Sequence, residues 1–267
     1  MYTMSSPPTY LAEKNSYERD SRIVFYEEPH IYEIDGQQGY TSVTTWNHSH
    51  FEHFDGNKII DNMIKKGKLE DPTYKYYGKS RQEILDMWAQ NGKEASGSGT
   101  KMHANIEYFY NKMDVDDKSI EYEYFMKFYE DNKNLEAYRT EWNIFHEEMK
   151  LSGSIDMVYQ DTNNGEFYIY DWKRSKSIDF DNKYGKTAHT ECIKDLPDCN
   201  FWHYSLQLNV YRKILREKYD INITKLCLVV LHPNNSSQSY DVVELPFMDK
   251  ELEKLWDFRK KQLETKE

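Results

Sequence analysis

The stretch "SGSIDMVYQDTNNGEFYIYDWKR", residues 152–174, decides the fold. Two strand-forming runs flank Asn164-Gly165, and this dipeptide is the strongest short signal for a β-hairpin. Side chains alternate across a strand, so Asp171 and Lys173 share one face of the second strand. The sequence therefore predicts a hairpin that carries a carboxylate and an ammonium side by side.

The position of the turn decides which side chains meet across this hairpin. If the two-residue turn is 164–165, Asp156 lies opposite Lys173. If the turn centres between residues 163 and 164, Asp156 lies opposite Asp171 instead. A shift of two residues changes partners but keeps faces, so both registers place Asp156, Asp171 and Lys173 on one side. A three-residue loop would break this arrangement unless a bulge restored it.

These three groups suggest a metal site. Two close carboxylates repel each other, and Lys173 offsets only part of that repulsion. A divalent cation relieves the rest, and hard oxygen ligands select Mg²⁺ or Mn²⁺. A lysine beside such a cation can orient water or stabilise charge that develops on a phosphate. The alternative is an ordinary surface ion pair, which contributes little to stability.

Two predicted helices carry further candidates. In "GTKMHANIE", residues 99–107, His103 and Glu107 are four apart and share one helical face. His103 could supply a nitrogen ligand and Glu107 a further carboxylate, or the two could be a satisfied histidine and a solvated acid. Gln207 and Tyr211 are also four apart; they could position a phosphate or base, or lie at an ordinary helix edge.

Composition sets wider limits on the protein. The chain has 267 residues, long enough for a substantial core, and a formal net charge of −11. Such a charge disfavours general attraction to nucleic acid, although a metal or a basic cleft can bind it locally. No apolar run is long enough for a membrane span, and the N-terminus lacks the apolar segment of a secretory signal. Three cysteines without a CxxC pair favour a reducing intracellular compartment: cytoplasm, nucleus or viral replication site.

Patterning along the chain predicts a mixed α/β fold, in which a central mixed β-sheet is flanked by helices. Residues 1–20 are expected to form a polar, partly disordered lead-in, followed by a single domain over 21–267. A hairpin turning at Asp35-Gly36 and interrupted helices fill 21–95, and Thr100 is a plausible N-cap for the next helix. The expected core spans 96–247, and a C-terminal helix is expected over 248–267. Within the core, helices are expected over 119–133 and 203–220. Strands are expected over 137–148, 152–160, 166–174, 225–233 and 239–246.

Four motifs in order resemble the PD-(D/E)XK nucleases, in particular their RecB-like branch. They are Gly99–His103 (GxxxH), Gly153–Asp156 (GxxD), Asp171–Lys173 (DxK) and Gln207–Tyr211 (QxxxY). The wider pattern, including "HIYEIDG", "SVTTW" and "LPDCNFWHYSLQLNVYR", is similar to exonucleases of the mitochondrial genome-maintenance type and their relatives in large DNA viruses and phages. The resemblance implies a restriction-endonuclease-like core with an N-terminal extension.

The resemblance also implies a role for each matching residue. His103, Asp156 and Asp171 would bind Mg²⁺ or Mn²⁺, with the backbone carbonyl of Trp172 as a further ligand. Lys173 would orient the attacking water and stabilise the pentavalent phosphate. Gln207 and Tyr211 would brace the site or contact the DNA backbone. Glu141, and Glu147 or Glu148, are weaker candidates for the site, and exposed charges at the strand edge are the alternative for them. Some relatives hold an iron–sulfur cluster with four cysteines, but the three cysteines here do not match, so no cluster is expected.

The segment between Lys173 and Gln207, about 33 residues long, is another candidate for substrate contact. Long loops at active sites are often functional, and basic residues interleaved with aromatics can guide a single strand by charge and stacking. The alternative is a loop packed by its own aromatics. Its candidates are Arg174, Lys176, Lys183, Lys186 and His203, interleaved with Phe180, Tyr184, Phe201 and Trp202.

These observations predict a metal-dependent nuclease acting on single-stranded DNA or DNA ends, most simply an exonuclease. The resemblance implies hydrolysis that leaves 5′-phosphates, and replication, repair or recombination proteins as possible partners. An RNA endonuclease with the same metal site is the nearest alternative. A non-catalytic DNA-binding accessory is the alternative from another class.

Overall fold

The computed structural model describes residues 8–265 and divides the chain into two compact units. Among the described residues, one unit comprises 8–52 and 102–265, and the other comprises 53–101. The sequence had grouped 21–95 as one extension, whereas residues 21–52 belong to the larger unit. The larger unit contains a mixed sheet flanked by helices, which confirms the predicted fold class.

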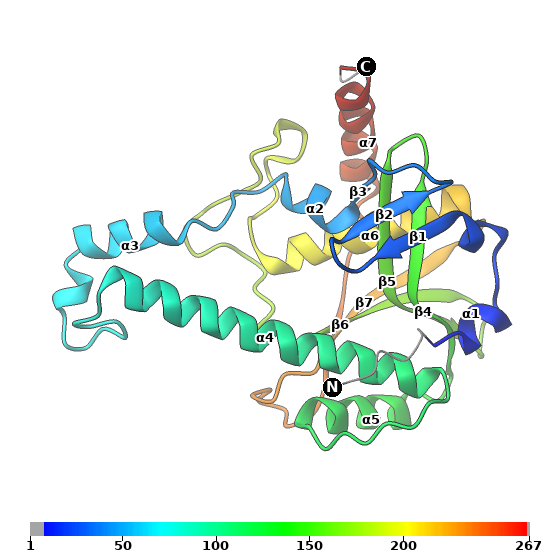
Figure 1. The fold of residues 1–267 in the computed structure, drawn as a ribbon, viewed down its shortest axis with the longest axis horizontal. Coiled ribbons are helices and arrows are strands. Elements are labelled where there is room, and N and C mark those ends of the chain that lie inside the picture. The colour runs from blue at the N-terminus through cyan, green and yellow to red at the C-terminus, as the bar shows by residue number, and fades with distance from the viewer. Residues whose placement is uncertain (1–7, 266–267) are drawn as a thin grey trace. The chain divides into compact units, whose positions relative to one another are not determined.

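The central sheet is built on three consecutive antiparallel strands, all of them predicted (Figure 1). The parallel pairing of β6 with β7 and the antiparallel pairing of β7 with β8 extend the sheet on one side. A two-residue strand, β3, pairs in parallel with the start of β5. The strands are β3 (Thr41–Ser42), β4 (Leu135–His146), β5 (Leu151–Asp161), β6 (Phe167–Lys173), β7 (Ile223–Val230) and β8 (Asp241–Glu244).

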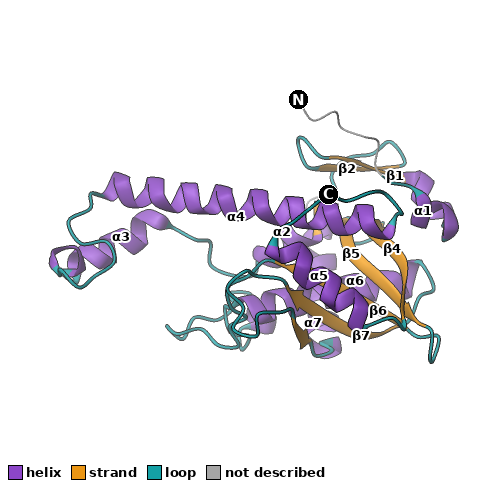
Figure 2. Ribbon diagram, turned by 90° about the horizontal axis from the view of Figure 1, so that it is seen from below, coloured by secondary structure: helices purple, strands orange, loops and turns teal. Residues whose placement is uncertain are grey.

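Helices cover both faces of this sheet. The predicted helix α6 (Asn200–Lys218) makes the crossover that two parallel strands require, between β6 and β7. It packs with α2 (Val43–His48) and α7 (Asp249–Glu264) over one apolar cluster. The other face holds α5 (Ile120–Asp131) beside the C-terminal end of α4, over a second cluster (Figure 2). Successive residues of a strand point to opposite faces of the sheet and therefore pack in different clusters: Ile169 belongs to the first cluster and Tyr170 to the second.

The N-terminal region differs from its prediction. A hairpin of β1 (Ile23–Tyr26) and β2 (Ile31–Ile34) does form, but it turns through residues 27–30 rather than at Asp35-Gly36. The segment 8–20 is packed and not a solvated lead-in, since Leu11 in α1 (Tyr10–Lys14) is buried. Asp20, in the 3₁₀ turn Glu18–Arg22, accepts hydrogen bonds from the side chains of Arg139 and Trp142. Residues 1–7 of the expected lead-in lie outside the described part of the chain.

A single long helix replaces the helix start expected near Thr100. Helix α4 runs from Arg81 to Tyr110, so Gly97, Gly99 and Thr100 all lie in its interior. The smaller unit holds α3 (Gly56–Lys65), the turn Lys68–Glu70 and the first part of α4 around a small core of Ile60, Tyr76 and Ile84. Among residues 8–265, no helix combines the length and apolarity needed to cross a bilayer.

Candidate metal centre

The hairpin of β5 and β6 takes the second of the two predicted registers. Met157 pairs with Tyr170, and continuing that register places Asp156 opposite Asp171. The loop closes because the Gly165 N–H donates to the Asp161 carbonyl at 2.7 Å and the Asp161 side chain accepts from the Asn163 N–H at 2.9 Å. These local bonds set a four-residue loop over 162–165 rather than a two-residue turn.

The three groups predicted on this hairpin occupy neighbouring positions. Asp156 Oδ2 accepts a hydrogen bond from the Trp172 backbone N–H at 2.9 Å, which ties β5 to β6. Lys173 Nζ lies 2.5 Å from Asp171 Oδ2, and both side chains are largely buried. The ammonium lies within charge-assisted hydrogen-bond distance of that oxygen, so Asp171 and Lys173 form a buried ion pair. The register of the hairpin places this carboxylate opposite Asp156, so two acids lie close together.

His103 reaches the same place from α4. Its Nδ1 lies 3.5 Å from Asp156 Oδ2 and 3.5 Å from Glu141 Oε1. In the described residues, one group of three or more potential ligands is close enough to hold an ion: His103, Glu141 and Asp156, whose ligand atoms all lie within 4.8 Å of one another. Asp171 lies beside this group, as the partner of Lys173.

Glu141 was a weaker sequence candidate, yet it is central to the group. The register of β4 and β5 pairs Thr140 with Met157 and Trp142 with Ile155, so Glu141 lies opposite Asp156. Its backbone has φ +42°, a left-handed conformation that costs a residue other than glycine on the order of 1–3 kcal/mol. Ser154 Oγ donates to Glu141 Oε2 at 3.0 Å and helps to fix the carboxylate. The sequence signal was a lone acid inside an apolar strand, the same signal that singled out Asp156.

The crowded charges shift the pKa values of the site. Burial lowers the pKa of His103, but the carboxylates of Asp156 and Glu141 outweigh it and raise that pKa to about 9. Burial and the neighbouring Asp156 raise the pKa of Asp171 to about 6. Burial also raises the pKa of Asp156. The negative charge of the carboxylates at this site exceeds the positive charge of His103 and Lys173. A bound cation would reduce the resulting repulsion.

Glu107 follows His103 by one helical turn and lies at the margin of the site. Burial, reinforced by Glu141, raises the pKa of Glu107 to about 7. For Lys173, burial and the neighbouring charges act on the pKa in opposite directions. Burial lowers its pKa, but Asp171 and Asp156 more than compensate, so the net shift is upward. At neutral pH the ammonium of Lys173 therefore stays protonated.

Helix α6 supports the site from the other side. Gln207 Nε2 donates to the Tyr211 hydroxyl at 3.3 Å, which links the two predicted residues. The Tyr211 ring packs directly on Gly153, where an added Cβ would lie 2.7 Å from Tyr211 Cε1. Sequence reasoning missed Tyr204, whose ring centroid lies 4.8 Å from Lys173 Nζ in a cation–π contact. Its spacing of three residues from Gln207 would have placed it on the same helical face.

The remaining candidates lie away from the ligand group and are largely engaged. Arg174 Nε pairs with Glu121 Oε1 at 2.6 Å, and His203 Nε2 contacts Asp198 Oδ1 at 2.9 Å. Lys176 is exposed. Glu147 pairs with Arg19 and Arg22, and Glu148 with Lys218. The long loop is packed in part by its own aromatics, because Phe180 lies against Phe201; Tyr184 stays 86% exposed.

The donor set fits a divalent cation. It combines one imidazole nitrogen with the carboxylate oxygens of Glu141 and Asp156, on two adjacent strands. Asp171, on the third strand, lies beside them as the partner of Lys173. The Trp172 carbonyl as a ligand stays a prediction. Comparison of the chain with protein-family models and with curated protein sequences finds no match. The geometry of the site and its chemistry are therefore the basis for assigning a function.

Proposed function

We propose that the protein is a metal-dependent nuclease that hydrolyses phosphodiester bonds in DNA, acting on single strands or on ends. One observation supports this most directly: the ligand group His103, Glu141 and Asp156 lies beside the buried ion pair of Asp171 and Lys173. An imidazole, several carboxylates and one ammonium at a single point suit catalysis of phosphoryl chemistry. His103, Asp156, Asp171 and Lys173 are also the residues to which the PD-(D/E)XK resemblance gives these roles, whereas Glu141 comes from the geometry alone.

In this proposal, His103, Asp156, Glu141 and Asp171 hold Mg²⁺ or Mn²⁺. When bound, the cation neutralises charge on the phosphate and lowers the pKa of a bound water.

The protein's own residues position and stabilise the reacting groups. The Trp172 N–H fixes the Asp156 carboxylate, and Ser154 fixes that of Glu141. Lys173 is held between Asp171 and the Tyr204 ring. Because its raised pKa keeps it protonated, Lys173 donates to a phosphate oxygen or to the attacking water and does not act as a general base.

The test separates metal binding from chemistry. Lys173→Ala should keep Mn²⁺ binding in calorimetry and lower cleavage of a labelled single DNA strand by roughly 100-fold or more. His103→Ala should weaken Mn²⁺ binding itself. Lys194→Ala is the matched control, because this lysine is exposed and pairs only with Glu191, and it should leave cleavage unchanged. Undiminished cleavage by the Lys173 variant would end the proposal.

Two further outcomes identify the alternatives. Cleavage of an RNA oligomer, with a DNA oligomer of the same sequence left intact, would assign the site to an RNA endonuclease. Absence of Mn²⁺ binding by the unaltered protein would favour a non-catalytic accessory. Single-strand DNA is preferred in the proposal because the loop after β6 exposes Phe180 and Tyr184, on which unpaired bases could stack.

A further inference from the structure

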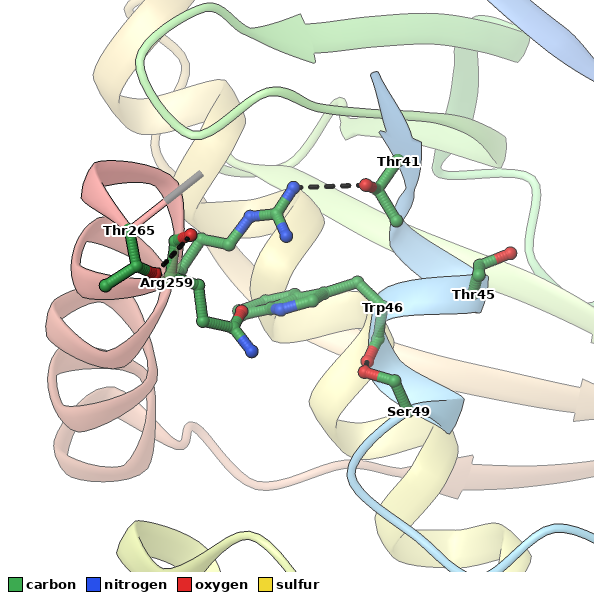
Figure 3. Close-up of a pocket in the computed structure, with 7 residues that line it drawn as sticks. Thr41, Thr45, Trp46, Ser49, Arg259 and Thr265 are labelled. Carbon is green, nitrogen blue, oxygen red and sulfur yellow. Dashed lines mark hydrogen bonds between the residues drawn. The ribbon is translucent and has the colours of Figure 1, made fainter. Parts of the chain in front are cut away.

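A separate cavity of about 320 Å³ lies between β3, α2 and α7 in the larger unit (Figure 3). Within the described part of the chain, its lining holds one cation and no carboxylate, although the full sequence has 46 acidic and only 35 basic residues. The other lining groups are hydroxyls, an amide and an indole. The lining residues are Thr41, Thr45, Trp46, Ser49, Arg259, Gln262 and Thr265.

The cation of this cavity, Arg259, has no negative partner in the described chain. Arg259 is only 7% exposed. Its Nε donates to the Met149 carbonyl at 3.0 Å, and its Nη2 donates to Thr41 Oγ1 at 3.1 Å and to the Lys150 carbonyl at 3.3 Å. All three acceptors are neutral, and within residues 8–265 no carboxylate forms an ion pair with the guanidinium. A buried charge without a counter-ion is unfavourable, so the cavity favours an anion.

Trp46 lines the same cavity with its indole ring. Trp46 is 2% exposed, and its indole N–H makes no hydrogen bond within the described residues. In Figure 3 the indole extends from α2 toward α7, the helix that carries Arg259. The indole is therefore close enough to the cavity for its N–H resonance to respond when an anion binds beside Arg259.

A neighbouring cavity of about 330 Å³ provides a comparison. It is lined by lysines and glutamates that neutralise one another: Lys213 Nζ lies 2.8 Å from Glu217 and 2.9 Å from Glu253, and Lys218 pairs with Glu148. A cavity of that kind needs no external ion. The cavity at Arg259 differs because no carboxylate among residues 8–265 pairs with its single charge.

We propose that the cavity at Arg259 binds a phosphate-type oxyanion, at a site distinct from the candidate metal centre. Thr41 pairs with Leu151 at the start of β5, whereas Asp156 lies five residues further along. At about 3.3 Å per residue, the two sites are roughly 16 Å apart along the strand. The anion is either free phosphate or the phosphoryl group of a nucleic-acid strand, and both would use the same donors.

The indole N–H of Trp46 reports on this site by NMR. The chain has six tryptophans, so the indole region of an ¹⁵N-labelled sample is simple, and Trp46→Phe identifies the resonance of Trp46 by its loss. Titration of the metal-free protein with inorganic phosphate should move that resonance, with sodium chloride at equal ionic strength as the control. A single-stranded oligonucleotide forms the second arm.

A charge variant tests the binding itself. Gln262→Glu places a carboxylate in the lining without altering the hydrogen bonds of Arg259, and it should weaken phosphate binding roughly tenfold or more by like-charge repulsion. Gln238→Glu adds the same charge at an exposed position between β7 and β8, at the opposite edge of the sheet from β3, and should leave binding unchanged. Movement with phosphate identifies a free-phosphate site, and movement with the oligonucleotide alone identifies the strand as the source. If neither ligand moves the Trp46 resonance, or if Gln262→Glu binds like the unaltered protein, the proposal is overturned.

Discussion

Replacing Gly153 by alanine should destabilise the protein through one contact. The new Cβ would lie 2.7 Å from Tyr211 Cε1 and 3.1 Å from the Tyr211 hydroxyl, whereas ordinary contact begins at 3.4 Å. Tyr211 is 3% exposed, so its ring has little room for the retreat of about 0.7 Å that this requires. Overpacking of this kind costs about 1–3 kcal/mol, and alanine recovers about 0.5–1 kcal/mol of backbone entropy.

The expected net loss is therefore about 1–2 kcal/mol in the free energy of unfolding. Urea denaturation followed by circular dichroism measures it as a lower midpoint with an unchanged slope. The same displacement pulls the Tyr211 hydroxyl away from Gln207, so cleavage activity should fall as well.

A double-mutant cycle shows whether Tyr211 is the cause. Combining Gly153→Ala with Tyr211→Leu removes the ring and should recover most of the loss that the alanine adds, whereas Tyr211→Phe keeps Cε1 in place and should not. The reasoning is refuted if Gly153→Ala is as stable as the unaltered protein. It is also refuted if the leucine and phenylalanine variants respond to the alanine alike.

Four further outcomes are expected. The folded-state pKa of His103, about 9, exceeds its ordinary 6.5, so its stabilisation of the metal-free protein should be complete below pH 6.5 and disappear toward pH 9; thermal melts of His103→Ala should lack this pH dependence. Mn²⁺ affinity should rise over the same range, because the metal needs the neutral imidazole, and calorimetry in two buffers should detect proton release. The raised pKa of Glu107, about 7, means that ionisation destabilises the fold as the pH rises from 4.5 through 7, so Glu107→Gln should be more stable than the unaltered protein at pH 8, on the order of 1 kcal/mol, and equal to it at pH 4.5; a gap of the same size at both pH values contradicts this. Asp20→Ala leaves the guanidinium of Arg139 buried without its partner and should cost about 3 kcal/mol in urea denaturation; an unchanged midpoint would show that the segment before β1 is dispensable.

The sequence predicted most of the elements around the site because their signals are local. Alternating apolar residues and the turn residues before Glu166 predicted β5 and β6, and the polar positions within them predicted Asp156, Asp171 and Lys173. The register stayed open because it depends on which hydrogen bonds close the loop after Asp161. Propensity rules could not decide between a turn of two residues and a loop of four.

The features that sequence reasoning missed depend on distant parts of the chain. Thr100 has the side chain of an N-cap, but the helix already extends from Arg81 and continues through it. Glu141 gains its importance from the register of β4 against β5, and Asp20 from contacts with residues more than a hundred positions away. Arg259 reads as one more charge on an amphipathic helix, and only the packed structure shows that it is buried.

The strained backbone at Glu141 lowers the stability of the fold, while its carboxylate contributes to the candidate metal centre. Glycine would adopt the same φ of +42° without strain, and asparagine would tolerate it better than glutamate does. Selection for thermal stability alone should therefore enrich glycine or asparagine at position 141. Either residue would relieve the backbone strain and remove one of several neighbouring negative charges. Such variants should unfold at a higher temperature than the unaltered protein and, if Glu141 is one of the proposed ligands, bind Mn²⁺ more weakly.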